Sequence, residues 1–105
     1  MRFIETPIFT KELRTLLKDD DYRALQTALL CRPEQGAIIP GSCGLRKLRW
    51  GGLGKGKRGG NRIIYYWDPK TEVVYMLFIY CKAYQADLTR AQVRLLSRIV
   101  KEEFK

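Results

Sequence analysis

The sequence predicts one α+β domain, residues 1–105, in which two N-terminal helices and a C-terminal helix pack on a small, mainly antiparallel sheet. Apolar residues recur at the spacing of amphipathic helices before residue 32 and again in residues 93–104. Between these regions, residues 61–68 and 72–80 have the β-branched and aromatic composition of strands. Helices at both ends of a run of strands indicate the α+β class.

The N-terminal region predicts a short strand followed by two helices. Residues 2–5 form the strand, and Thr6-Pro7 has the pattern of an N-cap with proline at the first helical position. Apolar spacing extends this helix over residues 7–18. Asp19-Asp20-Asp21 is expected to cap the second helix, which ends at Arg32-Pro33 because the residue before proline disfavours helix.

The middle of the chain predicts a strand between two loops. Residues 34–44 are expected to be loop, residues 45–50 alternate as a strand, and residues 51–60 form a glycine-rich connector. Successive side chains of a strand point to opposite faces, so Lys47 and Arg49 share one face.

The last elements are a hairpin and a capped helix. Residues 61–68 and 72–80 are the strands of the hairpin, joined by a turn at residues 68–71. Thr89 and Gln92 have the spacing of a capping box and mark the start of the C-terminal helix.

The net charge of +9 comes mainly from residues 41–62, where every charged side chain is basic. The segments on either side are close to charge balance. Clustered cations focus a positive potential, so this segment predicts a binding surface for a polyanion. Its basic residues are Arg46, Lys47, Arg49, Lys55, Lys57, Arg58 and Arg62.

The composition argues against several classes of protein. Three cysteines at wide spacings and no histidine make a zinc site and a secreted disulfide framework poor interpretations. The first residues lack a signal-peptide pattern, and the longest apolar run, residues 73–81, is too short to cross a bilayer. We therefore expect a cytoplasmic protein with no metal, no other cofactor and no membrane partner.

Two glycine motifs in the basic segment do not predict nucleotide sites. Residues 51–57 match the spacing of a phosphate-binding loop, but Arg58 stands where magnesium coordination needs serine or threonine. Residues 54–59 match a dinucleotide-binding pattern, yet the segment that follows reads as a strand and not a helix.

The basic segment suits two activities towards RNA. In binding alone, cations contact phosphates and aromatic rings stack on unpaired bases. In cleavage, a base takes the 2′-hydroxyl proton, cations stabilise the pentacoordinate phosphate and an acid protonates the leaving 5′-oxygen. Lysines crowded by other cations can act as bases in a chain without histidine, and arginines can brace the phosphate.

Four stretches of the chain carry a family pattern: residues 44–49, 54–66, 79–82 and 87–89, of which 54–66 is the most specific. They resemble the RelE/HigB-type toxins of bacterial toxin–antitoxin systems, in particular a HigB subgroup. The resemblance covers nearly the whole chain and implies a RelE-like fold. It also implies a ribosome-dependent endoribonuclease that cuts mRNA and is neutralised by a cognate antitoxin.

The resemblance further implies site residues. Catalytic basic residues on the strand after the two helices correspond to Lys47 and Arg49. An arginine before an apolar-aromatic strand corresponds to Arg62, and a basic residue after the last long strand corresponds to Lys82.

The chain departs from the family pattern at two positions. Ala83 replaces an arginine and Thr89 replaces a tyrosine, so Tyr84 is the substitute candidate for that tyrosine. The subgroup's basic loop, which could bind RNA or carry chemistry, contains Lys55, Lys57 and Arg58.

The main hypothesis is therefore a metal-independent endoribonuclease that acts through the 2′-hydroxyl. Lys47 or Lys57 would be the base, and Lys82 or Tyr84 the acid. The candidate catalytic residues are Lys47, Arg49, Lys57, Arg62, Lys82 and Tyr84, and the candidate RNA-binding residues are Arg46, Lys55 and Arg58.

The expected partners are the ribosome with its mRNA and a cognate antitoxin. The antitoxin is expected to be a helix-turn-helix protein encoded by an adjacent gene, and DNA would be contacted only through it. The alternative is a non-catalytic RNA- or ribosome-binding module. A third interpretation is a transcriptional partner whose basic face meets DNA.

Overall fold

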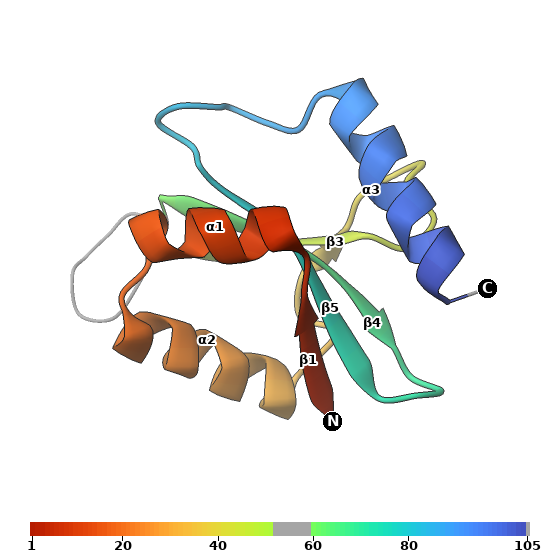
Figure 1. Ribbon diagram of the computed structural model, residues 1–105, viewed down its shortest axis with the longest axis horizontal. Helices are drawn as coiled ribbons and strands as arrows, with labels where there is room; N and C mark the ends of the chain where they lie inside the picture. The colour runs from red at the N-terminus through yellow and green to blue at the C-terminus, as the bar shows by residue number, and fades with distance from the viewer. Residues whose placement is uncertain (52–59, 105) are drawn as a thin grey trace.

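The computed structural model describes residues 1–51 and 60–104, which form helices around a five-stranded sheet (Figure 1). The strand order is β1-β5-β4-β3-β2; β1 is parallel to β5 and the other neighbouring pairs are antiparallel. The predicted α+β fold with a mainly antiparallel sheet is confirmed. The elements are β1 (Arg2–Glu5), α1 (Pro7–Leu16), α2 (Asp19–Cys31), β2 (Ala37–Ile38), β3 (Arg46–Trp50), β4 (Asn61–Asp68), β5 (Val73–Cys81) and α3 (Arg90–Glu103).

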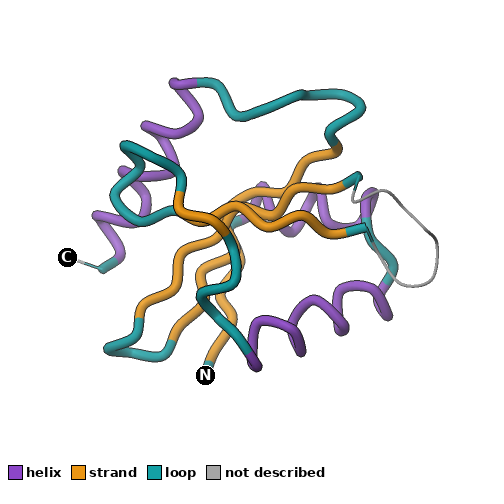
Figure 2. Tube along the Cα trace, turned by 180° about the vertical axis from the view of Figure 1, so that it is seen from behind, coloured by secondary structure: helices purple, strands orange, loops and turns teal. Residues whose placement is uncertain are grey.

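Helices pack on both faces of the sheet (Figure 2). On one face, Phe9 of α1 and Leu29 of α2 belong to a core cluster with Tyr65 of β4. On the other face, Leu96 of α3 packs in a second cluster with Ile64 of β4. Because both faces of β4 are buried in its middle, the strand is apolar at successive positions rather than at alternate ones.

Two of the three predicted side-chain caps are present. Thr6 Oγ1 accepts a hydrogen bond from the Phe9 N–H at 3.1 Å and donates one to the Leu77 carbonyl at 2.7 Å. The same hydroxyl therefore starts α1 and ties it to β5. Thr89 and Gln92 form the reciprocal capping box of α3.

The structure differs from the prediction at three points in the N-terminal half. α1 ends at Leu16 and not at residue 18, because Leu17 is extended. The three aspartates lie in the first turn of α2, where their negative charges interact favourably with the helix dipole. The N-cap residue is Lys18, whose side chain makes no capping hydrogen bond. Ala37–Ile38, predicted as loop, pairs with β3 as the edge strand β2.

A buried tyrosine explains how β2 is held beside β3. The Tyr65 hydroxyl donates to the Pro33 carbonyl at 2.7 Å and accepts from the Gly36 N–H at 2.9 Å. The approach is so close that a Cβ on Gly36 would lie 2.8 Å from the Tyr65 ring. These contacts anchor the segment after α2 to the sheet, and the chain then continues into β2.

Candidate active site

Two neighbouring strands bring cationic side chains to one face of the sheet. In the register of β3 and β4, Arg49 lies opposite Arg62 and Lys47 lies opposite Ile64. Directly opposed residues have Cβ atoms about 4.5–5.5 Å apart, and residues two positions apart share a face. Lys47, Arg49 and Arg62 therefore lie side by side, on the face that alternation predicts for the first two.

These three side chains line a hollow of about 490 Å³, which Lys82 lines as well. The Lys82 N–H donates to the Gly60 carbonyl at 2.7 Å, which fixes its backbone at the end of β5. None of the described residues that line the hollow is acidic. We call it the basic hollow; its other described lining residues are Gln35, Ala37, Leu48 and Ala86.

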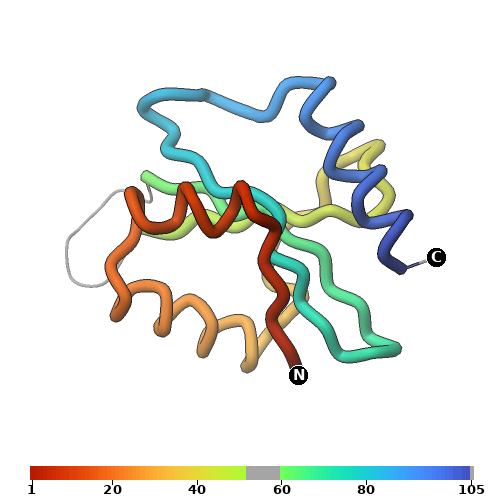
Figure 3. The backbone as a smooth tube through the Cα atoms, in the orientation of Figure 1, coloured from red at the N-terminus to blue at the C-terminus, as the bar shows by residue number. Residues whose placement is uncertain are grey.

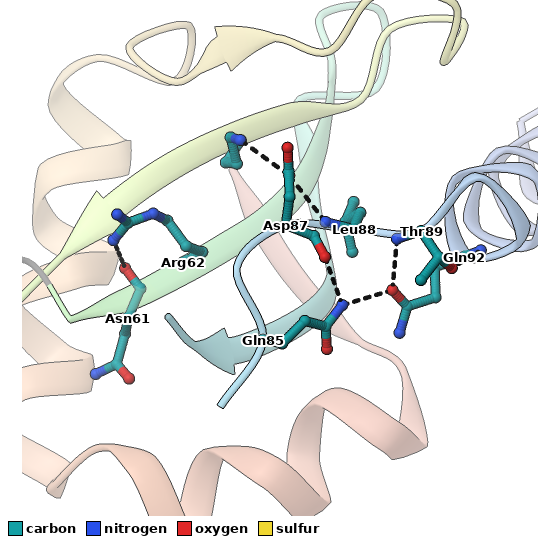
Figure 4. Close-up of polar contacts among 8 residues, drawn as sticks. Asn61, Arg62, Gln85, Asp87, Leu88, Thr89 and Gln92 are labelled. Carbon is teal, nitrogen blue, oxygen red and sulfur yellow. Dashed lines mark hydrogen bonds and ion pairs between the residues drawn. The ribbon is translucent and has the colours of Figure 1, made fainter. Parts of the chain in front are cut away.

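Arg62 is the most enclosed cation of the basic hollow, with 6% of its surface exposed. Its Nη1 donates to the Asn61 carbonyl at 3.3 Å (Figure 4). Arg49 and Tyr80 lie opposite it on the two flanking strands. Because arginine does not lose its proton in proteins, this position holds a permanent positive charge in a fixed place.

Lys47 is paired with a carboxylate at the rim of the basic hollow. Its Nζ lies 3.2 Å from Asp87 Oδ1, which also accepts the Leu88 N–H at 2.8 Å (Figure 4). The hydrogen bond from Leu88, and after it the one from Lys47, hold the pKa of Asp87 below its usual range. Asp87 is therefore ionised at neutral pH.

The structure does not bring Arg46 or Tyr84 to the basic hollow. Arg46 Nη1 donates to the carbonyls of Glu34 and Gly36 at 3.0 and 2.8 Å. Tyr84 is 88% exposed and lines a separate hollow beside α1. Three predicted residues lie outside the described part of the chain: Lys55, Lys57 and Arg58.

Neither Tyr80 nor Asp87 is among the predicted catalytic residues. Tyr80 lies opposite Arg62 and is 5% exposed, and its hydroxyl lies near the Asp87 carboxylate without a direct hydrogen bond to it. Burial raises the pKa of Tyr80, and the Asp87 carboxylate raises it further. The predicted hairpin pairs the two strands, but a bulge between Ile64 and Tyr65 shifts their register, so the pattern alone does not show which residue faces Arg62.

The described residues contain no cluster of side chains suited to bind a metal ion. Within residues 1–51 and 60–104, no group of three or more His, Cys, Asp or Glu side chains is placed to hold one. None of the helices in this part of the chain has the length and apolar composition needed to cross a membrane.

The fold and the basic hollow define a small α+β protein with a cationic site on one face of its sheet. No family model matches the chain. The solved structure of the E. coli toxin RelE, a variant with two arginines replaced by alanine, in the free state, is similar with a TM-score of 0.59. The match covers 93% of this chain and 94% of RelE at 16% sequence identity. The chain therefore has a RelE-like fold.

Proposed function

We propose that the chain is the toxin of a type II toxin–antitoxin system, in the HigB subgroup of the RelE/HigB-type toxins. In this proposal it is a ribosome-dependent endoribonuclease that cleaves translated mRNA and inhibits translation. The observation that carries the proposal is the convergence of Lys47, Arg49, Arg62 and Lys82 in one hollow on a RelE-like fold. Clustered cations of this kind suit a phosphodiester, whose charge increases during cleavage.

The basic hollow supports metal-independent cleavage by the 2′-oxygen. A base takes the 2′-hydroxyl proton, and the 2′-oxygen bonds to the adjacent phosphorus to close a 2′,3′-cyclic phosphate. The bond to the 5′-oxygen breaks as an acid gives that oxygen a proton. Arg49 and Arg62 stabilise the charge of the pentacoordinate state. Of the two candidate acids, Lys82 lines the hollow and Tyr84 does not, which favours Lys82.

The proposed partners follow from this activity. The ribosome presents the mRNA, and a cognate antitoxin, a helix-turn-helix protein encoded by an adjacent gene, neutralises the toxin. DNA is contacted only through the antitoxin, and the complex acts in the cytoplasm. An adjacent reading frame for a short helix-turn-helix protein would support this assignment.

Cell-free translation tests the proposal directly. An mRNA is translated with the purified protein, and its ends are mapped by primer extension, with a parallel reaction that lacks ribosomes. We expect cuts within the translated region only when ribosomes are present. Ribosome or RNA binding with intact mRNA would instead identify a non-catalytic module, and affinity for duplex DNA by the protein alone would favour the transcriptional interpretation.

A further inference from the structure

The carboxylate at the rim of the basic hollow is held by its own segment of chain. Figure 3 shows residues 82–89 leaving β5 and arching to the start of α3. Within this segment, the Gln85 side-chain amide donates to the Asp87 carbonyl at 2.9 Å and to Gln92 Oε1 at 2.6 Å. Gln92 Oε1 also accepts the Thr89 N–H at 2.9 Å, and Leu88 N–H binds the Asp87 carboxylate (Figure 4). Asp87 is therefore fixed by hydrogen bonds that do not involve Lys47.

Lys47 adopts the position that this fixed carboxylate defines. A lysine side chain is long and flexible, whereas the strand beneath it fixes only its Cα. The contact at 3.2 Å between Lys47 Nζ and Asp87 Oδ1 thus selects one place for the ammonium group. In this contact the Lys47 Nζ donates to the carboxylate and brings positive charge to the hollow.

We infer that Asp87 is a positioning residue that holds Lys47 as a fixed cation for the substrate phosphate, so that another group accepts the 2′-hydroxyl proton. The inference rests on the proposed function for the identity of the substrate. It removes Lys47 from the two candidate bases and gives it the role of Arg49 and Arg62, which is to stabilise phosphate charge.

Substitution of Lys47 separates a fixed charge from a base. Arginine keeps the positive charge but does not release a proton. We expect Lys47→Arg to retain mRNA cleavage within about tenfold, and Lys47→Gln to lose substantially more. Removal of a general base costs about 10²–10⁴-fold in rate. Lys47→Arg and Lys47→Gln that are equally inactive would overturn the inference.

Substitution of Asp87 tests the positioning role. Asp87→Asn keeps an oxygen for the Leu88 N–H but loses the charge that holds Lys47. We expect cleavage at saturating ribosome concentration to fall about two- to fivefold, the range of a partly exposed ion pair. Asp68→Asn makes the same charge change near the far end of β4, about 20 Å from Arg62 along the strand, and should not slow cleavage.

A double-mutant cycle shows whether Asp87 acts through Lys47. In the Lys47→Gln background, Asp87→Asn should cause no further loss, because the ammonium group that it positions is gone. Independent, additive losses would mean that Asp87 supports the structure by another route, and faster cleavage by Asp87→Asn alone would show that it restrains the site. Either result overturns the inference.

The same variants distinguish failure of the inference from failure of the proposed function. If the wild-type protein cuts no mRNA with ribosomes, the proposed function is wrong. Affinity for a short single-stranded RNA, measured for the same cycle, then decides the inference. The inference is supported if Lys47→Arg binds the RNA more tightly than Lys47→Gln and if Asp87→Asn causes no further loss of affinity in the Lys47→Gln background. Equal affinities of Lys47→Arg and Lys47→Gln would refute it.

Discussion

One face of the sheet has an apolar end and a cationic end. At the apolar end, Ile64 and Leu77 are covered by Leu96 of α3. At the cationic end, Arg62 lies two residues before Ile64 on the same face of β4. It lines the basic hollow together with Arg49. The same strands therefore pass from a packed core to a charged site within one repeat of the strand pattern.

The two ends differ in what they contribute to the stability of the fold. Burial of apolar surface under α3 stabilises the fold in proportion to the area removed from water. A buried arginine contributes little to stability or opposes it, because its charge loses hydration. Under the proposed function, the arginine at the cationic end serves binding of the phosphate, and the two ends should respond differently to substitution.

The largest effect is expected at the apolar end. Leu96→Ala, at a residue 5% exposed, should lower the free energy of unfolding by about 2–5 kcal/mol. Denaturant unfolding measures this loss. Leu95→Ala is the matched control, because the neighbouring leucine of α3 is 52% exposed. Equal losses in the two variants would contradict the packing of α3 on the sheet through Leu96.

At the cationic end, the expected effect is on activity. Arg62→Ala should slow mRNA cleavage about 10²–10³-fold, because it removes a positioned charge from the phosphate, and it should abolish growth inhibition. Circular dichroism should show a retained fold. Arg98→Ala, an exposed arginine of α3, is the control. If the two variants cleave equally well, the basic hollow is not the active site.

Two buried tyrosines differ in the partners of their hydroxyl groups. Tyr65→Phe should lower the free energy of unfolding by about 1–3 kcal/mol, because the Gly36 N–H and the Pro33 carbonyl lose their partner. Tyr80→Phe removes a buried hydroxyl that lies near the Asp87 carboxylate but makes no direct hydrogen bond within the described residues, and should change the free energy of unfolding by less than about 1 kcal/mol. Thermal unfolding of both variants checks this, and a larger loss for Tyr80→Phe would show that its hydroxyl is bound.

The smallest effect concerns acid stability at the rim of the hollow. The folded-state pKa of Asp87 is lowered, so its contribution to stability is present above the usual aspartate pKa of about 3.9 and is lost as the pH falls through the lowered value. The difference in unfolding free energy between wild type and Asp87→Asn should therefore shrink on acidification. Part of it should survive in Lys47→Gln, because the Leu88 N–H forms a stronger hydrogen bond with the Asp87 carboxylate than with a neutral amide oxygen. If the difference in unfolding free energy increased on acidification, the direction of the Asp87 pKa shift would be wrong.

The sequence predicts those parts of the molecule that depend on local pattern. Composition defines β4 at residues 61–68, capping chemistry places the start of α3, and alternation puts Lys47 and Arg49 on one face. Each of these follows from neighbours within a few positions. The α+β class follows from the order of such elements, and the RelE-like fold is implied by the resemblance to the RelE/HigB-type toxins.

The parts that escape prediction depend on contacts between distant residues. The segment before β2 is held by the Tyr65 hydroxyl, which reaches Pro33 and Gly36 about thirty positions earlier. Asp87 lies at the rim of the hollow and forms an ion pair with Lys47, which is forty positions away in the sequence. No periodicity marks such partners, because their proximity is created by the register of the sheet and the path of residues 82–89.

The pairing of β1 with β5 determines when the sheet can form during synthesis of the chain. The first strand of the chain runs beside the last, and the Thr6 hydroxyl bonds to Leu77 across 71 positions. Domains complete their folding during synthesis only when the interacting segments have emerged, and such distant pairings form slowly. The sheet therefore closes after β5 has been made, and the hollow after Lys82. A nascent chain therefore has no complete basic hollow until its synthesis is nearly finished.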